Sequence, residues 1–164
     1  MASKKENLLD WLKNAYAMEN AQVTVLEKHA KDAEDYTEVH DKIAEHAEQT
    51  KQHAETVRRC VQELGDDVSK VKSTMGQAGA TFQNLGGSMS EDKLVKDTIA
   101  DFAAENLEIA SYNSIITAAN ELGEQRVVQA CQKILEQEKA MANWLAQEVP
   151  VATREYLREQ AEGI

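Results

Sequence analysis

The lengths of the links between helix-forming segments constrain the fold of this chain most. Four long segments favour helix, because they are rich in Ala, Leu, Glu, Lys and Gln and their apolar residues recur at helical spacing. They cover residues 4–31, 36–64, 91–122 and 125–148. The last of them ends before Pro150, and a short fifth helix is predicted over residues 151–161.

Only a few residues join the first segment to the second and the third to the fourth, so each pair should form an antiparallel hairpin. Residues 65–90 separate the second and third segments, which is enough for a partly helical crossover along a bundle, ending at Gly86 and Gly87. The second and third helices should therefore run parallel. The sequence predicts an all-α fold, a ferritin-like four-helix bundle with this long crossover and the short fifth helix, as a single domain over residues 1–164. An open helical array is less favoured, because no repeat of roughly 30 to 50 residues recurs.

The charge of the chain limits its partners. Its formal net charge is -11 at pH 7 with no basic face to offset it, so we expect no nucleic-acid binding. The absence of a signal peptide and of an apolar run of spanning length predicts a cytoplasmic protein with no membrane partner. Cys60 and Cys131 lie in half-apolar helical contexts and are interpreted as buried free thiols of a reducing compartment.

Carboxylates interrupt the apolar stripes of three segments. Glu19 lies on the stripe that contains Leu12, Glu138 lies at the centre of the stripe in residues 125–148, and Glu105 and Glu108 lie one turn apart. A buried carboxylate is costly, and it is normally paired, protonated or bound to a metal ion. For any single glutamate the alternative is a helix-edge position that only looks buried, because the phase of a helix is hard to read from sequence.

The spacing of these glutamates favours a shared site. Glu108 and Glu138 are 30 residues apart across one hairpin, and the same step from Glu19 across the other hairpin leads to Gln49. Equal spacing in two hairpins indicates a pseudo-twofold bundle whose midpoint collects side chains from four helices.

Two histidines add to the candidate donors, since His46 and His53 lie one turn on either side of that glutamine. Carboxylates and imidazoles are the ligand types of iron, manganese and zinc. Di-iron bundles carry Glu-x-x-His on two helices, but the histidine positions of that pattern hold Gln52 and Met141 here. The residues alone therefore support a metal site only in part.

Other polar residues have less specific interpretations. Tyr16 and Tyr112 lie one turn from two of the inward glutamates, where they either hydrogen-bond the carboxylates or pack the bundle with their hydroxyls satisfied nearby. His29 and His40 lie near helix ends, where we expect surface or capping roles.

Four stretches carry a family likeness, and they are LLDWLKNAYAMENAQ, IAEHAEQTKQ, AENLEIASYNSIITAANELG and LEQEKAMANWLAQEVP. They resemble the YciE/YciF family of bacterial ferritin-like, rubrerythrin-related stress proteins, and the YciE branch most closely. The motif E-x-x-E-I-A-x-Y from Glu105 to Tyr112 and the run E-K-x-M-A-x-W-L from Glu138 are specific when taken together. The resemblance covers nearly the whole chain.

This resemblance implies a cytoplasmic homodimer of four-helix bundles with a di-metal centre of iron or manganese, zinc being an alternative. The family has H-x-x-E-T where this chain has HAEQT from His46 to Thr50, so Gln49 replaces one expected carboxylate. Carried over residue by residue, the ligands implied by the resemblance are Glu19, His46, Glu105, Glu108 and Glu138.

Two functions stay open at this point. The first is a metal-binding stress-response protein that handles peroxide or iron through a di-metal centre. The second is a non-catalytic helical stress or interaction protein whose buried polar centre is a vestigial metal site that gives packing specificity. The sequence does not decide between turnover and binding alone.

Overall fold

The chain folds into long helices, as its periodicity predicts. The computed structural model describes residues 1–69, 71 and 90–163. These residues form the helices α1 (Lys4–Asp32), α2 (Thr37–Glu63), α4 (Lys93–Leu122) and α5 (Gln125–Glu162). The all-α prediction is confirmed, and the predicted helix boundaries lie within one or two residues of those observed, except at the end of α5.

Local signals explain where the helices begin and end. Ser3 accepts a hydrogen bond from the Glu6 backbone while the Glu6 carboxylate accepts one from the Ser3 backbone, which forms the expected capping box of α1. Gly65 follows α2 and Gly123 ends α4, with φ of 87° and 73°. Because only glycine adopts this left-handed conformation without steric cost, both helices stop there.

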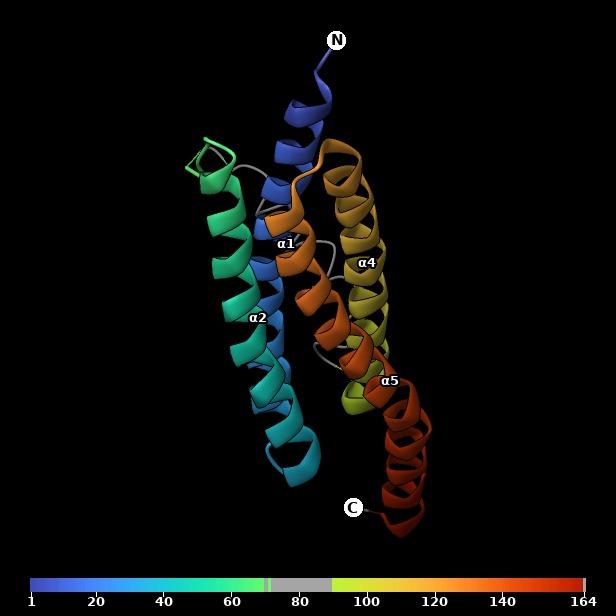
Figure 1. Ribbon diagram of the computed structural model, residues 1–164. Coiled ribbons are helices and arrows are strands. Elements are labelled where there is room, and N and C mark those ends of the chain that lie inside the picture. Colours follow the sequence, from blue (N-terminus) through green and yellow to red (C-terminus); the bar gives the residue numbers. More distant parts are fainter. Residues whose placement is uncertain (70, 72–89, 164) are drawn as a thin grey trace.

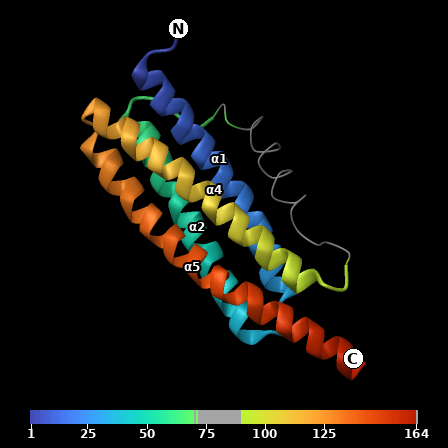
Figure 2. The ribbon, with the colours of Figure 1, turned by 90° about the vertical axis from the view of Figure 1, so that its right-hand side faces the viewer.

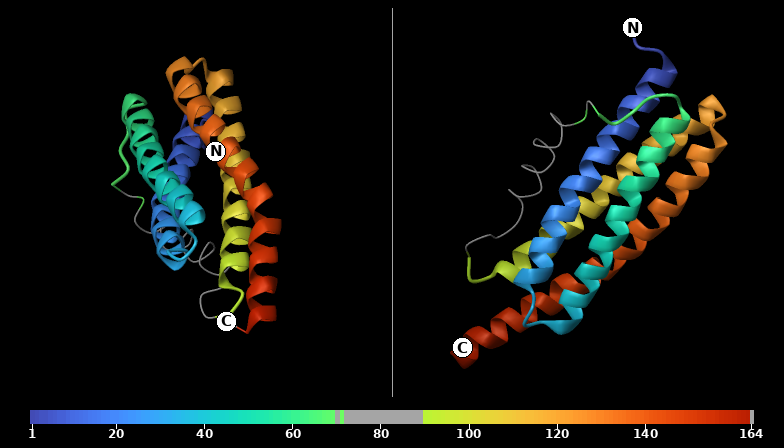
Figure 3. Two further views of the ribbon diagram at one scale, coloured as in Figure 1. Left: turned by 90° about the horizontal axis from the view of Figure 1, so that it is seen from below. Right: turned by 90° about the vertical axis from the view of Figure 1, so that its left-hand side faces the viewer.

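The helices pair as two antiparallel hairpins, α1 with α2 and α4 with α5, seen as two layers in Figure 3. Between the layers, α1 packs on α4 and α2 packs on α5. Figure 1 shows α2 and α4 running in the same direction, so the predicted parallel arrangement of the second and third helices is confirmed. The crossover predicted between them falls largely on residues 72–89, outside the described residues.

The prediction of a separate fifth helix is wrong in one respect. Residues 151–161 are helical, but they continue α5 through Pro150, and the end of this helix projects past the start of α2 (Figure 2). Proline removes one backbone hydrogen bond from a helix, a cost that surrounding contacts can offset. Here Ala152 is buried, and the Tyr36 hydroxyl lies 2.8 and 3.0 Å from the two carboxylate oxygens of Glu159.

The buried interior consists of two apolar clusters separated by a polar layer. The first cluster includes Leu12, Val61 and Val127, and the second includes Leu26 and Leu145. The layer between them contains the buried charged and amide side chains that come from the middle of each helix. The polar side chains therefore lie between two apolar clusters, which exclude water above and below them along the bundle axis.

His29 is part of a buried charge cluster, so the surface or capping role predicted for it is wrong. Its Nδ1 lies 2.8 Å from Asp101 Oδ1 and its Nε2 lies 3.3 Å from Asp97 Oδ1. His29 lies near the end of α1, but the aspartates on α4 pack against it and it is buried. By contrast, His40 Nδ1 bonds the Ala30 carbonyl at 2.8 Å near the end of α1, which confirms its capping role.

Among the helices of the described residues, none combines the length and the apolar character needed to cross a membrane.

Replacing His29 by Gln should destabilise the protein most at acid pH. Burial lowers the pKa of the His29 imidazole, but its contacts with Asp101 and Asp97 outweigh this and raise the pKa above 6.5. A pKa that is raised by folding contributes stability below the unfolded value and loses it as the pH rises through the folded value. Urea unfolding should show a loss of about 3 kcal/mol near pH 6 and a smaller loss near pH 9. Equal losses at the two pH values would contradict a charged pair.

Candidate metal centre

The polar layer brings together six ionisable side chains from all four helices. Residues seven apart on α2 and three apart on α4 share a helix face, which directs both members of each pair inward. All six are nearly or completely inaccessible to solvent. They are Glu19 from α1, His46 and His53 from α2, Glu105 and Glu108 from α4, and Glu138 from α5.

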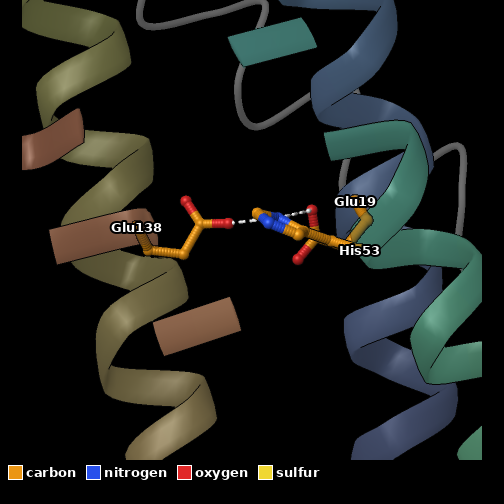
Figure 4. Close-up of side chains that lie close together, drawn as sticks. All are labelled: Glu19, His53 and Glu138. Atoms are coloured by element: carbon orange, nitrogen blue, oxygen red, sulfur yellow. Dashed lines mark ion pairs between the residues drawn. The ribbon is translucent and has the colours of Figure 1, made fainter. Parts of the chain in front are cut away.

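Glu19, His53 and Glu138 form a first group of potential metal ligands (Figure 4). His53 Nδ1 lies 2.6 Å from Glu138 Oε1 and 3.6 Å from Glu19 Oε2. The imidazole therefore stands between two carboxylates that come from opposite hairpins.

His46, Glu105 and Glu138 form the second group that the described residues contain. His46 Nε2 lies 2.9 Å from Glu105 Oε1 and 3.6 Å from Glu138 Oε2. Glu138 thus belongs to both groups, with one oxygen near each histidine. A carboxylate in this position is suited to bridge two cations.

Each histidine is oriented by a glutamine on the side away from the carboxylates. His46 Nδ1 lies 3.2 Å from Gln49 Oε1, and His53 Nε2 lies 2.6 Å from Gln137 Oε1. An amide oxygen only accepts, so these two nitrogens carry hydrogen, and the opposite nitrogens face the carboxylates. Such outer partners fix the tautomer and the ring orientation of a metal-binding histidine.

Tyr112 takes the first of the two roles left open for it. Its buried hydroxyl donates a hydrogen bond to Glu19 Oε1. Tyr16 is half-buried and packs at the edge of the first apolar cluster. Only Tyr112 of these two tyrosines therefore reaches the polar centre through a hydrogen bond described in the structure.

Burial dominates the protonation of the carboxylates without metal. It raises the pKa of Glu19, and it raises the pKa values of Glu105 and Glu108 well above the ordinary 4.5. For Glu138, burial acts in the same direction, but interactions with Glu105, His46 and His53 lower its pKa.

The histidines hold the opposite charge. Burial lowers the pKa of His53, but contacts with Glu138 and Glu19 outweigh this and raise it to about 10. The same balance raises the pKa of His46. The metal-free centre therefore keeps protons where a cation would otherwise neutralise the carboxylates.

One observation of this structure indicates that the donor set fits a pair of cations. Both oxygens of Glu138, and one each of Glu19 and Glu105, have no hydrogen-bond partner among the described residues. Buried carboxylate oxygens rarely remain without a donor, since each costs about 1–3 kcal/mol or more. A mixed carboxylate and imidazole set matches iron, manganese or zinc.

The sequence identified most of this arrangement, with two differences. The structure brings Glu19, His46, Glu105 and Glu138 into the two groups, while Glu108 is buried nearby but belongs to neither. His53 was considered as a donor but left out of the predicted ligands, although its position two turns from His46 on one face was a usable signal.

Gln49 occupies the position where the symmetry of the two hairpins predicts a carboxylate. Its side-chain oxygen accepts a hydrogen bond from His46 Nδ1. The glutamine that replaces the family's glutamate at this position therefore orients the His46 ring.

Known proteins agree with this fold and identify the family. A family model described as a domain of unknown function, DUF892, matches residues 3–158. The chain belongs to the DUF892 family.

Solved structures extend the comparison. A protein from Xanthomonas campestris pv. campestris is 32% identical, with 98% of this chain and 99% of that chain covered and a TM-score of 0.82. The E. coli stress protein YciF is 20% identical, with 94% and 99% covered and a TM-score of 0.79. A Desulfovibrio desulfuricans bacterioferritin, a protein with a diiron site, is 18% identical, with 99% and 91% covered and a TM-score of 0.75.

These matches confirm the resemblance of this DUF892 chain to the YciE/YciF proteins and its ferritin-like four-helix fold. The closer assignment to the YciE branch stays a prediction.

Glu108→Gln should stabilise the metal-free protein at alkaline pH. Burial and the charges of Glu138 and Glu105 raise the pKa of Glu108 well above 4.5, and neither of its oxygens has a hydrogen-bond partner among the described residues. A carboxyl group whose pKa is raised by folding loses stability as the pH rises from its unfolded pKa toward its folded pKa, and an amide of the same shape removes this cost. Chelator-treated protein should gain about 1–3 kcal/mol in urea unfolding near pH 8 and less near pH 5.

The matched control is Glu45→Gln, because Glu45 is an exposed glutamate on α2. It should change the free energy of unfolding little at either pH. A loss of stability at about pH 8 in Glu108→Gln would show that the Glu108 carboxylate is stabilised by its surroundings.

Proposed function

We propose that this protein binds two divalent transition-metal ions, iron or manganese, at the bundle midpoint and handles peroxide or iron in a stress response. The observation that supports this most is Glu138, which is shared by two groups of buried donors and has one oxygen facing each histidine. Zinc fits the same donors but lacks redox chemistry.

Each ion would have its own ligands and one in common. Glu19 and His53 would hold one ion, His46 and Glu105 would hold the other, and Glu138 would be available to both. Glu108 would contribute an additional buried negative charge beside the ions. Four carboxylates next to two dications leave the filled centre close to neutral, which a buried site requires.

Iron or manganese would supply one-electron redox chemistry, and the chain's residues would control its surroundings. Gln49 and Gln137 orient the imidazoles, and Tyr112 holds Glu19 in place through its hydroxyl. The apolar clusters above and below keep water out of the layer. These features would hold the ions in a dry and fixed environment.

Two accompanying proposals concern the whole molecule. We propose a homodimer, since Trp11, Ile99 and Leu107 expose apolar surface on α1 and α4. We also propose a cytoplasmic location, which suits the free thiols of Cys60 and Cys131.

A non-catalytic packing role is the second candidate function. The close pairing of His53 with Glu138 favours it, since this contact neutralises charge without a metal ion. A buried polar network of this kind can specify one arrangement of helices.

Metal addition should separate the two functions through thermal stability. Wild-type protein freed of metal should gain about 3 kcal/mol with Fe²⁺, Mn²⁺ or Zn²⁺ at a hundredfold excess over the dissociation constant. Glu19→Ala and Glu138→Ala should abolish the gain, because each removes a ligand. The gain should be larger at about pH 8 than at about pH 6, since the proton on His53 must leave first. The measurement is the melting temperature with and without each ion, anaerobically for Fe²⁺.

Glu45→Ala is the control for these variants and should retain the full metal-dependent gain. If no ion shifts the wild-type melting temperature, the packing role stands. If Glu45→Ala loses the shift together with Glu19→Ala, the stabilisation arises from ions on the acidic surface.

Gln49 should control metal affinity through the orientation of His46. Gln49→Leu removes the acceptor for His46 Nδ1 and should weaken binding about 10- to 100-fold, measured by competition with a chromophoric chelator. Gln49→Glu keeps an acceptor, adds a negative charge and should tighten binding. Gln52→Leu changes an exposed glutamine one turn along α2 and should leave affinity unchanged. Equal affinities of Gln49→Leu and wild type would remove Gln49 from the site.

A further inference from the structure

The two cysteines of the chain face each other between the hairpins. Cys60 follows His53 by seven residues on α2, and Cys131 precedes Glu138 by seven residues on α5. Because α2 and α5 run antiparallel, equal steps in opposite chain directions from a contacting pair lead to another pair at one level. The contact between His53 and Glu138 therefore sets Cys60 opposite Cys131.

The thiols are in contact and surrounded by apolar side chains. Each thiol shifts the pKa of the other, as expected of neighbouring groups, and both residues belong to the first apolar cluster together with Val57, Val61 and Val127. Both are free cysteines. The pair lies about 10 Å along the bundle from the polar layer, the length of two helical turns.

The two thiols differ in access and in acidity. Cys60 is itself buried, with 4% of its surface exposed, but it lines a surface hollow of about 370 Å³ at the seam of α2 and α5, whereas Cys131 is completely buried. The hollow is far larger than the roughly 30 Å³ that a water molecule occupies, so a molecule of peroxide size can enter it. The neighbouring Cys131 lowers the pKa of Cys60, whereas Cys60 and burial raise the pKa of Cys131.

We propose that Cys60 and Cys131 form a dithiol site that reacts with hydrogen peroxide or a small hydroperoxide and closes to a disulfide between α2 and α5. Cys60 is the attacking thiol, because it lines the hollow and Cys131 does not. Cys131 is the resolving thiol, because it contacts Cys60 from the closed side. This activity is independent of the metal centre.

The chemistry balances with peroxide as the oxidant. The Cys60 thiolate attacks one peroxide oxygen, the O–O bond breaks, and the released hydroxide takes up a proton to leave as water. The sulfur of Cys131 then attacks the sulfenic sulfur of Cys60, an S–S bond forms, and the second oxygen leaves as water. Two thiols are oxidised by two electrons in total, and one peroxide is reduced to two waters.

The product would join the two hairpins covalently. In the reduced protein α2 and α5 meet through non-covalent contacts, and α2 belongs to one hairpin and α5 to the other. A disulfide at this seam would hold the hairpins together and raise the melting temperature by restricting the unfolded chain.

The test uses the full chain, fully reduced and kept in chelator so that no metal takes part. Hydrogen peroxide is added, and thiols are then counted in denaturant while the intact mass is measured. Both thiols should disappear together, the mass should fall by that of two hydrogen atoms, and a dithiol reductant should reverse both changes. Proteolysis should yield one peptide pair linked through Cys60 and Cys131.

Serine variants assign the two roles. Cys131→Ser should leave a sulfenic acid on Cys60 that a cyclic 1,3-dione traps, and Cys60→Ser should leave Cys131 unlabelled. The inference is overturned if both wild-type thiols survive excess peroxide, if the disulfide joins two chains, or if Cys131 is labelled as readily as Cys60. Circular dichroism checks that each variant is folded, and the wild-type mass change decides the question if either is not.

Discussion

The structure depends on the pairing of Glu138 with two histidines inside the bundle. A carboxylate at this depth is stable only when charges or donors surround it, and His53 and His46 lie 2.6 and 3.6 Å from its two oxygens. Because the histidines come from one hairpin and the glutamate from the other, the pairing holds the hairpins in register. The fold and the candidate site therefore depend on the same atoms.

The remaining buried polar residues lie near the pairing of Glu138 with the two histidines. α4 buries Asp101, Glu105, Glu108 and Tyr112 along one face, so the face that would normally supply apolar contacts supplies charges. Because α4 buries few apolar side chains within the layer, the apolar clusters on either side of the layer must provide the hydrophobic stabilisation. A chain selected for stability alone would fill this layer with Leu and Ile, so the acidic face indicates that the layer has a use.

Sequence reasoning gave the helices, their order and the inward glutamates, because periodicity and connection length encode them directly. The predictions were wrong where a contact between helices outweighs a local sequence preference. Pro150 normally marks a helix end, but contacts of the following residues keep α5 continuous. His29 looks like a surface residue until Asp97 and Asp101 of α4 are placed beside it. The place of His53 in the polar layer and the absence of Glu108 from both groups of potential ligands depend on the rotation of each helix, which periodicity defines too coarsely.

The seam between α2 and α5 holds two residue pairs in one register. A contact between His53 and Glu138 implies one between Cys60 and Cys131, because the residues are separated by equal steps on antiparallel helices. A slip of one turn between α2 and α5 would separate both pairs at once, leaving a buried carboxylate and two thiols beside unrelated side chains. Such a slip would cost the charge pairing of the centre, several kcal/mol for a buried pair. The electrostatic contact at the midpoint therefore keeps the sulfur atoms together two turns away.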